Sequence, residues 1–157
     1  MDIKLKLIDC DDFNILSILF SENNVPVVTN NFLPFSLTQA TAKWIACDPH
    51  QDRFYICILD GKAVGFSMLR GWEEGYSVPS FGMFVDHQFQ GRGIGKVLMN
   101  LTIEEARKLG CFQVRLSVYA NNLVACKIYH YAGFIEIERS KTEKGLDYKI
   151  IMIKDLI

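Results

Sequence analysis

Residues 83–98 read MFVDHQFQGRGIGKVL, and the expected fold and function both depend on this stretch. Three glycines, Gly91, Gly93 and Gly95, follow an apolar strand and open a helix. Glycine lets the backbone turn tightly and lets a ligand approach it without a Cβ in the way. The first turn of a helix also has unpaired N–H groups at its positive end. The stretch therefore predicts a binding site for a pyrophosphate.

Two familiar phosphate motifs do not fit these residues. A Walker loop needs a glycine where Gln90 stands and a serine or threonine where Val97 stands. A dinucleotide motif, Gly-x-Gly-x-x-Gly, read from Gly91 ends on Lys96, and read from Gly93 it also lacks its last glycine. The pyrophosphate site is therefore of another type.

Outward from this stretch, hydrophobic periodicity predicts strands and helices over the whole chain. The predicted strands cover residues 3–7, 53–59, 62–69, 80–86, 114–118, 134–139 and 146–153. Three predicted helices cover residues 13–20, 94–109 and 125–132. A further helix, with Ser36 or Thr38 as its cap, is predicted to run through Ala42 and Ile45 and to stop before Pro49. Asp60-Gly61 and Lys144-Gly145 predict hairpin turns, and residues 22–34 predict a loop. We expect one α/β (α+β) domain, residues 1–157, with a mixed, mostly antiparallel twisted sheet of about seven strands and about four helices packed over it.

Composition excludes several classes of protein. Lys and Arg total 17 against 18 Asp and Glu, so no extended field attracts nucleic acid or an anionic membrane. The N-terminus lacks the layout of a signal peptide, and no apolar run is long enough to cross a bilayer. We therefore expect a soluble cytoplasmic protein.

The cysteines and histidines predict neither a disulfide framework nor a metal site. The five cysteines are odd in number, scattered and never in a Cys-x-x-Cys pair, so we expect reduced, mostly buried thiols. The three histidines, His50, His87 and His130, are too far apart in sequence to indicate metal ligation.

Two blocks of sequence together carry a family resemblance. Gln90-x-x-Gly93-x-Gly95 after an apolar strand resembles the acyl-CoA-binding signature of the GNAT N-acetyltransferase superfamily. Residues 118–134, VYANNLVACKIYHYAGF, resemble the second block of that superfamily, with its register at Asn122, Ala125, Tyr129, Gly133 and Phe134. One glycine turn alone is a weak signal, but two blocks about thirty residues apart in the right order are jointly specific.

The resemblance implies that acetyl-CoA is the cosubstrate. In the family, strands four and five splay apart and the pantetheine arm lies between them, here along Phe84 and Val85, while Asn122 reaches the arm. The pyrophosphate would lie on backbone N–H groups, with the side chains of Arg92 and Lys96 adding charge; this segment comprises Gln90, Gly91, Arg92, Gly93, Ile94, Gly95 and Lys96. Asn122 is also a good helix N-cap, which needs no ligand.

The resemblance makes Tyr129 the candidate general acid for the departing CoA thiolate. By spacing alone Tyr129 belongs to an apolar helical stripe, and a tyrosine there is more often a core residue. A phenol held beside the sulfur in a dry pocket would help the thiolate to leave. Cys126 has no obvious activating partner, so we expect direct transfer without a covalent enzyme intermediate.

The general base is not identified by the resemblance. Strand four opens Ser80-Phe81-Gly82, without the carboxylate that the family often uses there. Glu73 and Glu74, in the loop after strand three, are the nearest acidic candidates, and a solvent-exposed loop is an equal alternative.

Several functions therefore remain open. The leading hypothesis is N-acetylation of a primary amine on a small molecule, such as an amino sugar, an amino acid or a polyamine. Acetylation of a protein N-terminus or lysine, and a non-catalytic acyl-CoA-binding module, are the alternatives. A homodimer through the closing strands is a further possibility.

Overall fold

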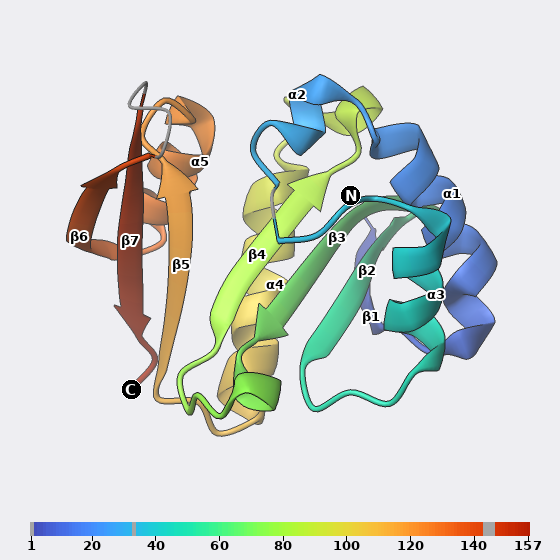
Figure 1. Ribbon diagram of the computed structural model, residues 1–157, viewed down its shortest axis with the longest axis horizontal. Helices are drawn as coiled ribbons and strands as arrows, with labels where there is room; N and C mark the ends of the chain where they lie inside the picture. The colour runs from blue at the N-terminus through green and yellow to red at the C-terminus, as the bar shows by residue number, and fades with distance from the viewer. Residues whose placement is uncertain (1, 33, 143–146) are drawn as a thin grey trace.

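The computed structural model describes residues 2–32, 34–142 and 147–157 and contains one seven-stranded sheet with helices on both faces (Figure 1). Its strands are β1 (Ile3–Leu7), β2 (Arg53–Leu59), β3 (Lys62–Arg70), β4 (Ser80–Val85), β5 (Gln113–Tyr119), β6 (Ile135–Lys141) and β7 (Tyr148–Asp155). Its α-helices are α1 (Phe13–Asn23), α2 (Pro26–Thr29), α3 (Gln39–Cys47), α4 (Ile94–Lys108) and α5 (Leu123–Tyr131). Three short 3₁₀ helices are η1 (Cys10–Asp12), η2 (Trp72–Glu74) and η3 (His87–Phe89).

The sheet is mixed and mostly antiparallel, as the sequence predicts. The strand order is β1-β2-β3-β4-β5-β7-β6. Neighbouring strands are antiparallel except β4 and β5, which are parallel. This parallel pair lies in the middle of the sheet, where the two halves of the chain meet.

The hairpin of β2 and β3 is confirmed at the predicted turn. Asp60 and Gly61 both have positive φ, 50° and 81°, as a type I′ turn requires. Because this turn twists in the same sense as the strands, it sets the register of the hairpin, in which Leu59 faces Lys62.

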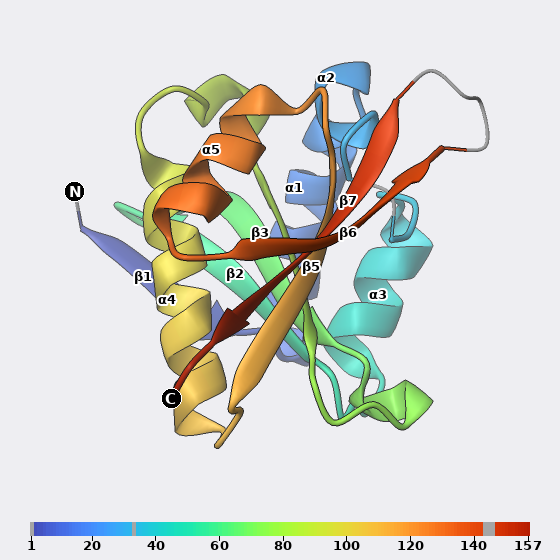
Figure 2. The ribbon, with the colours of Figure 1, turned by 90° about the vertical axis from the view of Figure 1, so that its left-hand side faces the viewer.

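Alternating side chains of the central strands fill two cores. On one face, Phe54, Phe66 and Phe84 pack with apolar residues of α1, α2 and α3. On the other face, apolar residues of the sheet pack against α4 and α5. Figure 2 shows α4 and α5 on one side of the sheet and α1 and α3 on the other.

The structure corrects the loop that the sequence predicts over residues 22–34, and it does not describe one predicted turn. Residues 22–34 contain α2, which begins with Pro26 at its first turn, where proline's missing N–H costs nothing. The predicted turn at Lys144-Gly145 lies outside the described residues. Among the residues described, every helix is too short or too polar to cross a bilayer.

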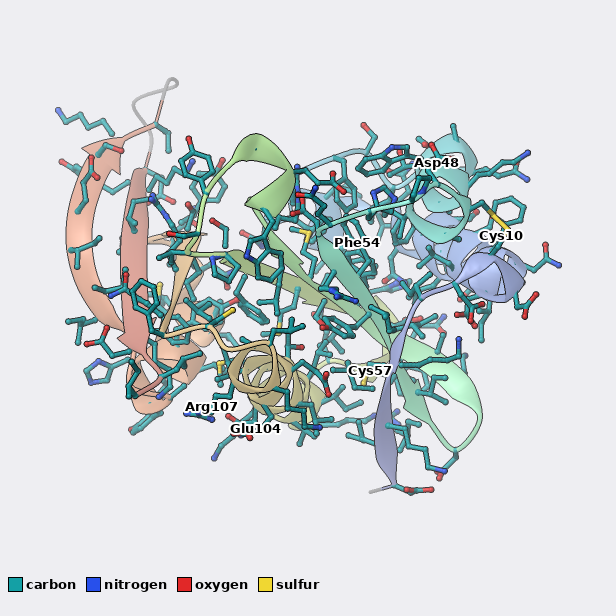
Figure 3. The ribbon with its side chains drawn as sticks, turned by 90° about the horizontal axis from the view of Figure 1, so that it is seen from below. Cys10, Asp48, Phe54, Cys57, Glu104 and Arg107 are labelled. Atoms are coloured by element: carbon teal, nitrogen blue, oxygen red, sulfur yellow. A yellow bond between two sulfur atoms is a disulfide. The ribbon has the colours of Figure 1, made fainter. Side chains whose placement is uncertain are left out.

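A disulfide contradicts the prediction of five reduced cysteines. Cys10 and Cys47 are bonded, although 37 residues separate them in sequence (Figure 3). The packing of α3 against η1 and α1 brings their Cα atoms to 4.4 Å. Of the remaining cysteines, Cys57 is buried, while Cys111 and Cys126 are partly exposed. The prediction failed because tertiary packing, not sequence spacing, creates this pairing.

Candidate active site

The two middle strands diverge and open a cleft. Within the described residues, β4 and β5 are paired at one position, Ser80 with Arg115, and beyond it they run apart (Figure 1). The divergence leaves backbone groups of β4 without a strand partner on this edge, where an extended ligand can bind. A cleft of about 770 Å³ lies here, lined by residues of β3, β4, β5, α2, α5 and the glycine turn.

The glycine turn forms one end of the cleft. Gly91 and Gly93 have φ values of +78° and +80°, and an added Cβ at either would meet nothing within 4 Å. Gly93 is the N-cap of α4, and no side chain in the described part of the chain caps this helix. The N–H groups of the first turn of α4 are therefore free to bind an anion.

Most of the predicted CoA-binding residues line the cleft. They are Phe84, Val85, Gln90, Gly91, Gly93, Ile94, Gly95 and Asn122. The ring of Phe84 also packs on Phe20 and Phe66. Arg92 and Lys96 are exposed and do not line the cleft, and the Arg92 guanidinium lies 4.9 Å from the ring of Phe89. These two cations flank the glycine turn instead.

A buried asparagine holds the loop that carries the glycine turn. The Oδ1 of Asn23, on α1, accepts a hydrogen bond from the His87 backbone N–H at 2.9 Å. Its amide donates to the Leu19 carbonyl oxygen, and the residue is completely buried. The sequence offered no sign of this contact, because 64 residues separate its partners.

The second sequence block forms the opposite wall. Asn122 is the N-cap of α5, and its Oδ1 accepts from the Ala125 N–H at 3.3 Å. Its capping role is thus confirmed, and it also lines the cleft.

Tyr129 lies on α5 and lines the same cleft. Its ring packs edge-on against Phe81 and Phe134, with centroid distances of 6.1 and 5.9 Å. Burial raises the pKa of Tyr129 above its usual value, so the phenol keeps its proton over the physiological pH range. Among the described residues its hydroxyl has no hydrogen-bond partner, which leaves it available to a ligand in the cleft.

Cys126 is poorly suited to be a nucleophile. Burial raises the pKa of its thiol, and the Sγ donates to the Tyr119 carbonyl oxygen at 3.5 Å. A thiol with a raised pKa forms little thiolate at neutral pH.

Glu73 and Glu74 face different surroundings, although they are adjacent in η2. Glu74 lines the cleft. The Glu73 carboxylate instead lies against Gln51 and His50, in a separate shallow hollow of about 460 Å³. Its Oε1 accepts from the Gln51 N–H at 2.8 Å and lies 3.1 Å from His50 Nδ1. Burial opposes ionisation of Glu73, but these hydrogen bonds and one from the Asp52 N–H outweigh it and lower the Glu73 pKa.

The structure adds polar residues to the cleft that the sequence did not single out. Arg70, at the end of β3, and Lys149, on β7, both line it. Arg70 precedes the Glu73-Glu74 pair closely in sequence, but nothing in the spacing indicated that its side chain faces the site. Among the residues described, no group of three or more His, Cys, Asp or Glu side chains could hold a metal ion.

Comparison with known proteins agrees with this arrangement. The family model described as the acetyltransferase (GNAT) family matches residues 20–134, which include both walls of the cleft. The chain belongs to this family of N-acetyltransferases. The family and the fold expected from the sequence are thereby confirmed.

Curated relatives of this GNAT chain match over part of their length. An uncharacterized N-acetyltransferase of Methanocaldococcus jannaschii is 37% identical over 61% of this chain and 44% of its own length. The N-acetylaspartate synthetase of Rattus norvegicus is 36% identical over 52% of this chain and 27% of its own. The spermine/spermidine N(1)-acetyltransferase of Bacillus subtilis is 30% identical over 46% of each. The matched region thus spans less than half of each relative.

Solved structures match over the whole fold. The aminoglycoside acetyltransferase AAC(6')-Ib, in complex with coenzyme A, has a TM-score of 0.75 and 18% identity, covering 99% of this chain and 95% of its own. At this identity the likeness concerns the fold, and a protein of this fold binds coenzyme A.

Proposed function

We propose that this GNAT domain transfers an acetyl group from acetyl-CoA to the primary amine of a small molecule, by direct attack in the cleft. The observation that carries the proposal is that one cleft is lined by the glycine turn at the uncapped start of α4 and by the Tyr129 phenol. The first feature suits a pyrophosphate, and the second suits a leaving thiolate. Both come from the two sequence blocks that resemble the family.

The residues of the cleft fit acetyl-CoA, which would supply the activated thioester. Backbone N–H groups from Gln90 to Lys96 would bind the pyrophosphate, with Arg92 and Lys96 adding positive charge around it. The unpaired edge of β4 would bind the pantetheine arm, and Asn122, which lines the same cleft, would contact it. Tyr129 would hold a proton ready for the sulfur when the amine nitrogen bonds to the acetyl carbon and the carbon–sulfur bond breaks.

Glu74 is the acidic residue that we propose for the amine side of the reaction. An alkylammonium has a pKa near ~10 and must lose a proton before it can attack. Because Glu74 lines the cleft, it can attract the ammonium and accept that proton directly or through water. Glu73 was an equal candidate in the sequence, but its carboxylate is engaged outside the cleft.

Replacing the two glutamates separately tests this assignment. Glu74→Gln should raise KM for the amine several-fold and shift the pH–rate profile, with CoA affinity unchanged. Glu73→Gln should leave these kinetic values near those of the parent and lower the unfolding free energy by about 1 kcal/mol, because three hydrogen bonds to a partly exposed carboxylate are weakened.

The stability effect of Glu73 has a defined pH dependence. Its pKa in the folded protein is below the ordinary value of 4.5, so its contribution is complete above pH 4.5 and disappears as pH falls through the folded value. Chemical denaturation of parent and Glu73→Gln at several pH values measures this dependence.

Equal effects of Glu73→Gln and Glu74→Gln on KM and on the pH–rate profile would refute the assignment of the amine to Glu74 alone.

A thiol-release assay distinguishes the proposed function from its alternatives. Acetyl-CoA would be incubated with a panel of amino acids, amino sugars, polyamines and peptides while free CoA thiol is measured. Release with small amines supports the proposal, whereas release with peptides alone supports a protein acetyltransferase. Tight CoA binding without release for any amine would indicate a non-catalytic binding module. A single domain over residues 1–157, a cytoplasmic location and a homodimer remain predictions.

A further inference from the structure

The charged residues of the cleft are few and are mainly cationic. Within the described part of the lining they are Arg70, Lys149 and Glu74. Arg70 and Lys149 make no ion pair with another described residue. They come from different walls, since Arg70 ends β3 and Lys149 lies on β7, opposite Tyr119 of β5. The cleft as a whole thus presents two cations and one anion.

The backbone of Arg70 lies near the part of β4 that Tyr129 contacts. It pairs with Ser80 across β3 and β4, and Ser80 precedes Phe81, against which Tyr129 packs. Neighbouring strands lie about 4.8 Å apart and successive residues about 3.4 Å apart. The backbone of Arg70 is therefore within the length of a small molecule from the part of β4 that Tyr129 contacts.

The Arg70 guanidinium is held in place by an aromatic ring. Its Cζ lies 5.6 Å from the centroid of Phe35, and Phe35 packs in turn on Phe32 and Phe66. A cation–π contact with a ring face uses none of the N–H groups of the guanidinium as a hydrogen-bond donor. A planar fork of donors held in this way suits a carboxylate, which it can bind through two hydrogen bonds.

We propose that the acceptor is a small amine that also carries a carboxylate, such as an amino acid, and that Arg70 binds this carboxylate. This inference rests on the proposed function and names its substrate class. Glu74 receives the ammonium group, while Arg70 receives the acid. A polyamine offers only positive charge, so two cations in the cleft disfavour it by like-charge repulsion.

The names of the relatives do not decide between these substrates. One matched relative is named for N-acetylaspartate and another for spermine and spermidine. The choice between these substrates therefore rests on the charged residues of this chain's own cleft.

The test compares matched acceptors and a charge-removing variant. The thiol-release rate would be measured with free amino acids, with the corresponding amino acid amides, and with spermidine. The parent should prefer each accepted amino acid over its amide by about 10- to 100-fold in kcat/KM, as expected for a charged bidentate hydrogen bond. Arg70→Gln should reduce this preference to near one and leave the CoA dissociation constant unchanged.

Two further variants separate charge from geometry. Arg70→Lys should restore part of the preference, because it keeps the charge but loses the fork. Arg139→Gln, on β6 outside the cleft and paired with Glu136, should match the parent in every assay. If Arg70→Gln fails to fold, the ratio of kcat/KM for an amino acid to kcat/KM for its amide would be compared between the parent and Arg70→Lys. A smaller ratio in Arg70→Lys supports the carboxylate site, and an equal ratio contradicts it.

The outcomes distinguish this inference from the proposed function. Amides or spermidine used as well as amino acids, or an equal loss on all acceptors in Arg70→Gln, would overturn the carboxylate site while leaving N-acetyl transfer intact. No thiol release with any amine would overturn the proposed function itself.

Discussion

Replacing Tyr129 by phenylalanine should lower the single-turnover rate of acetyl transfer by roughly 10²- to 10⁴-fold, the range for loss of a general acid. The substitution keeps the ring that packs on Phe81 and Phe134, and the hydroxyl has no partner among the described residues. Little stability should therefore be lost, and CoA affinity should barely change. Rapid mixing under single-turnover conditions is the suitable measurement, because slow product release could hide the effect in kcat.

Tyr131→Phe is the matched control for this prediction. Tyr131 lies on the same helix, is 76% exposed and does not line the cleft, so removing its hydroxyl should leave the rate unchanged. Because burial raises the pKa of Tyr129, the parent should also keep its acid form at any pH below 10. Parent-like single-turnover rates for Tyr129→Phe across this pH range would show that Tyr129 is a core residue.

The second large effect is expected at the start of α4. Gly93→Ala should weaken CoA binding by about 10- to 100-fold. A residue with a Cβ is strained at φ +80°. A backbone change that relieves this strain would turn N–H groups of the first turn of α4 away from the pyrophosphate. Isothermal titration calorimetry with CoA measures this loss.

Gly110→Ala provides the control for backbone strain. Gly110 has φ +84°, has nothing within 4 Å of an added Cβ, and follows the opposite end of the same helix. Both substitutions should lower the unfolding free energy by about 1–2 kcal/mol, yet only Gly93→Ala should affect CoA. Equal CoA affinities for the two variants would place the pyrophosphate elsewhere.

Local patterns predicted the elements that build the cleft. The Asp60-Gly61 turn, the glycine-opened helix and the Asn122 cap each depend on a few neighbouring residues, and the structure has each of them where expected. Their geometry follows from backbone preferences that short segments already express.

Features that depend on distant segments were not predictable in the same way. The Cys10–Cys47 bond needs η1 beside α3, and the separation of Glu73 from Glu74 needs backbone N–H groups more than twenty residues earlier in the chain. Arg70 reaches the cleft because of its face on β3 and its contact with Phe35. Such contacts are set by packing, for which a single sequence gives no direct signal.

A balance of products is the most direct test of acetyl transfer from acetyl-CoA to an amine within this cleft. The protein would be mixed with acetyl-CoA, with and without an accepted amine, and the free thiol, the N-acetylated amine and the intact mass of the protein would be measured together. We predict one CoA thiol for each N-acetylated amine, no release without amine, and a protein whose mass does not change. Thiol release without amine together with a stably acetylated protein, or CoA binding with no acetylated amine from any acceptor, would contradict direct transfer to an amine.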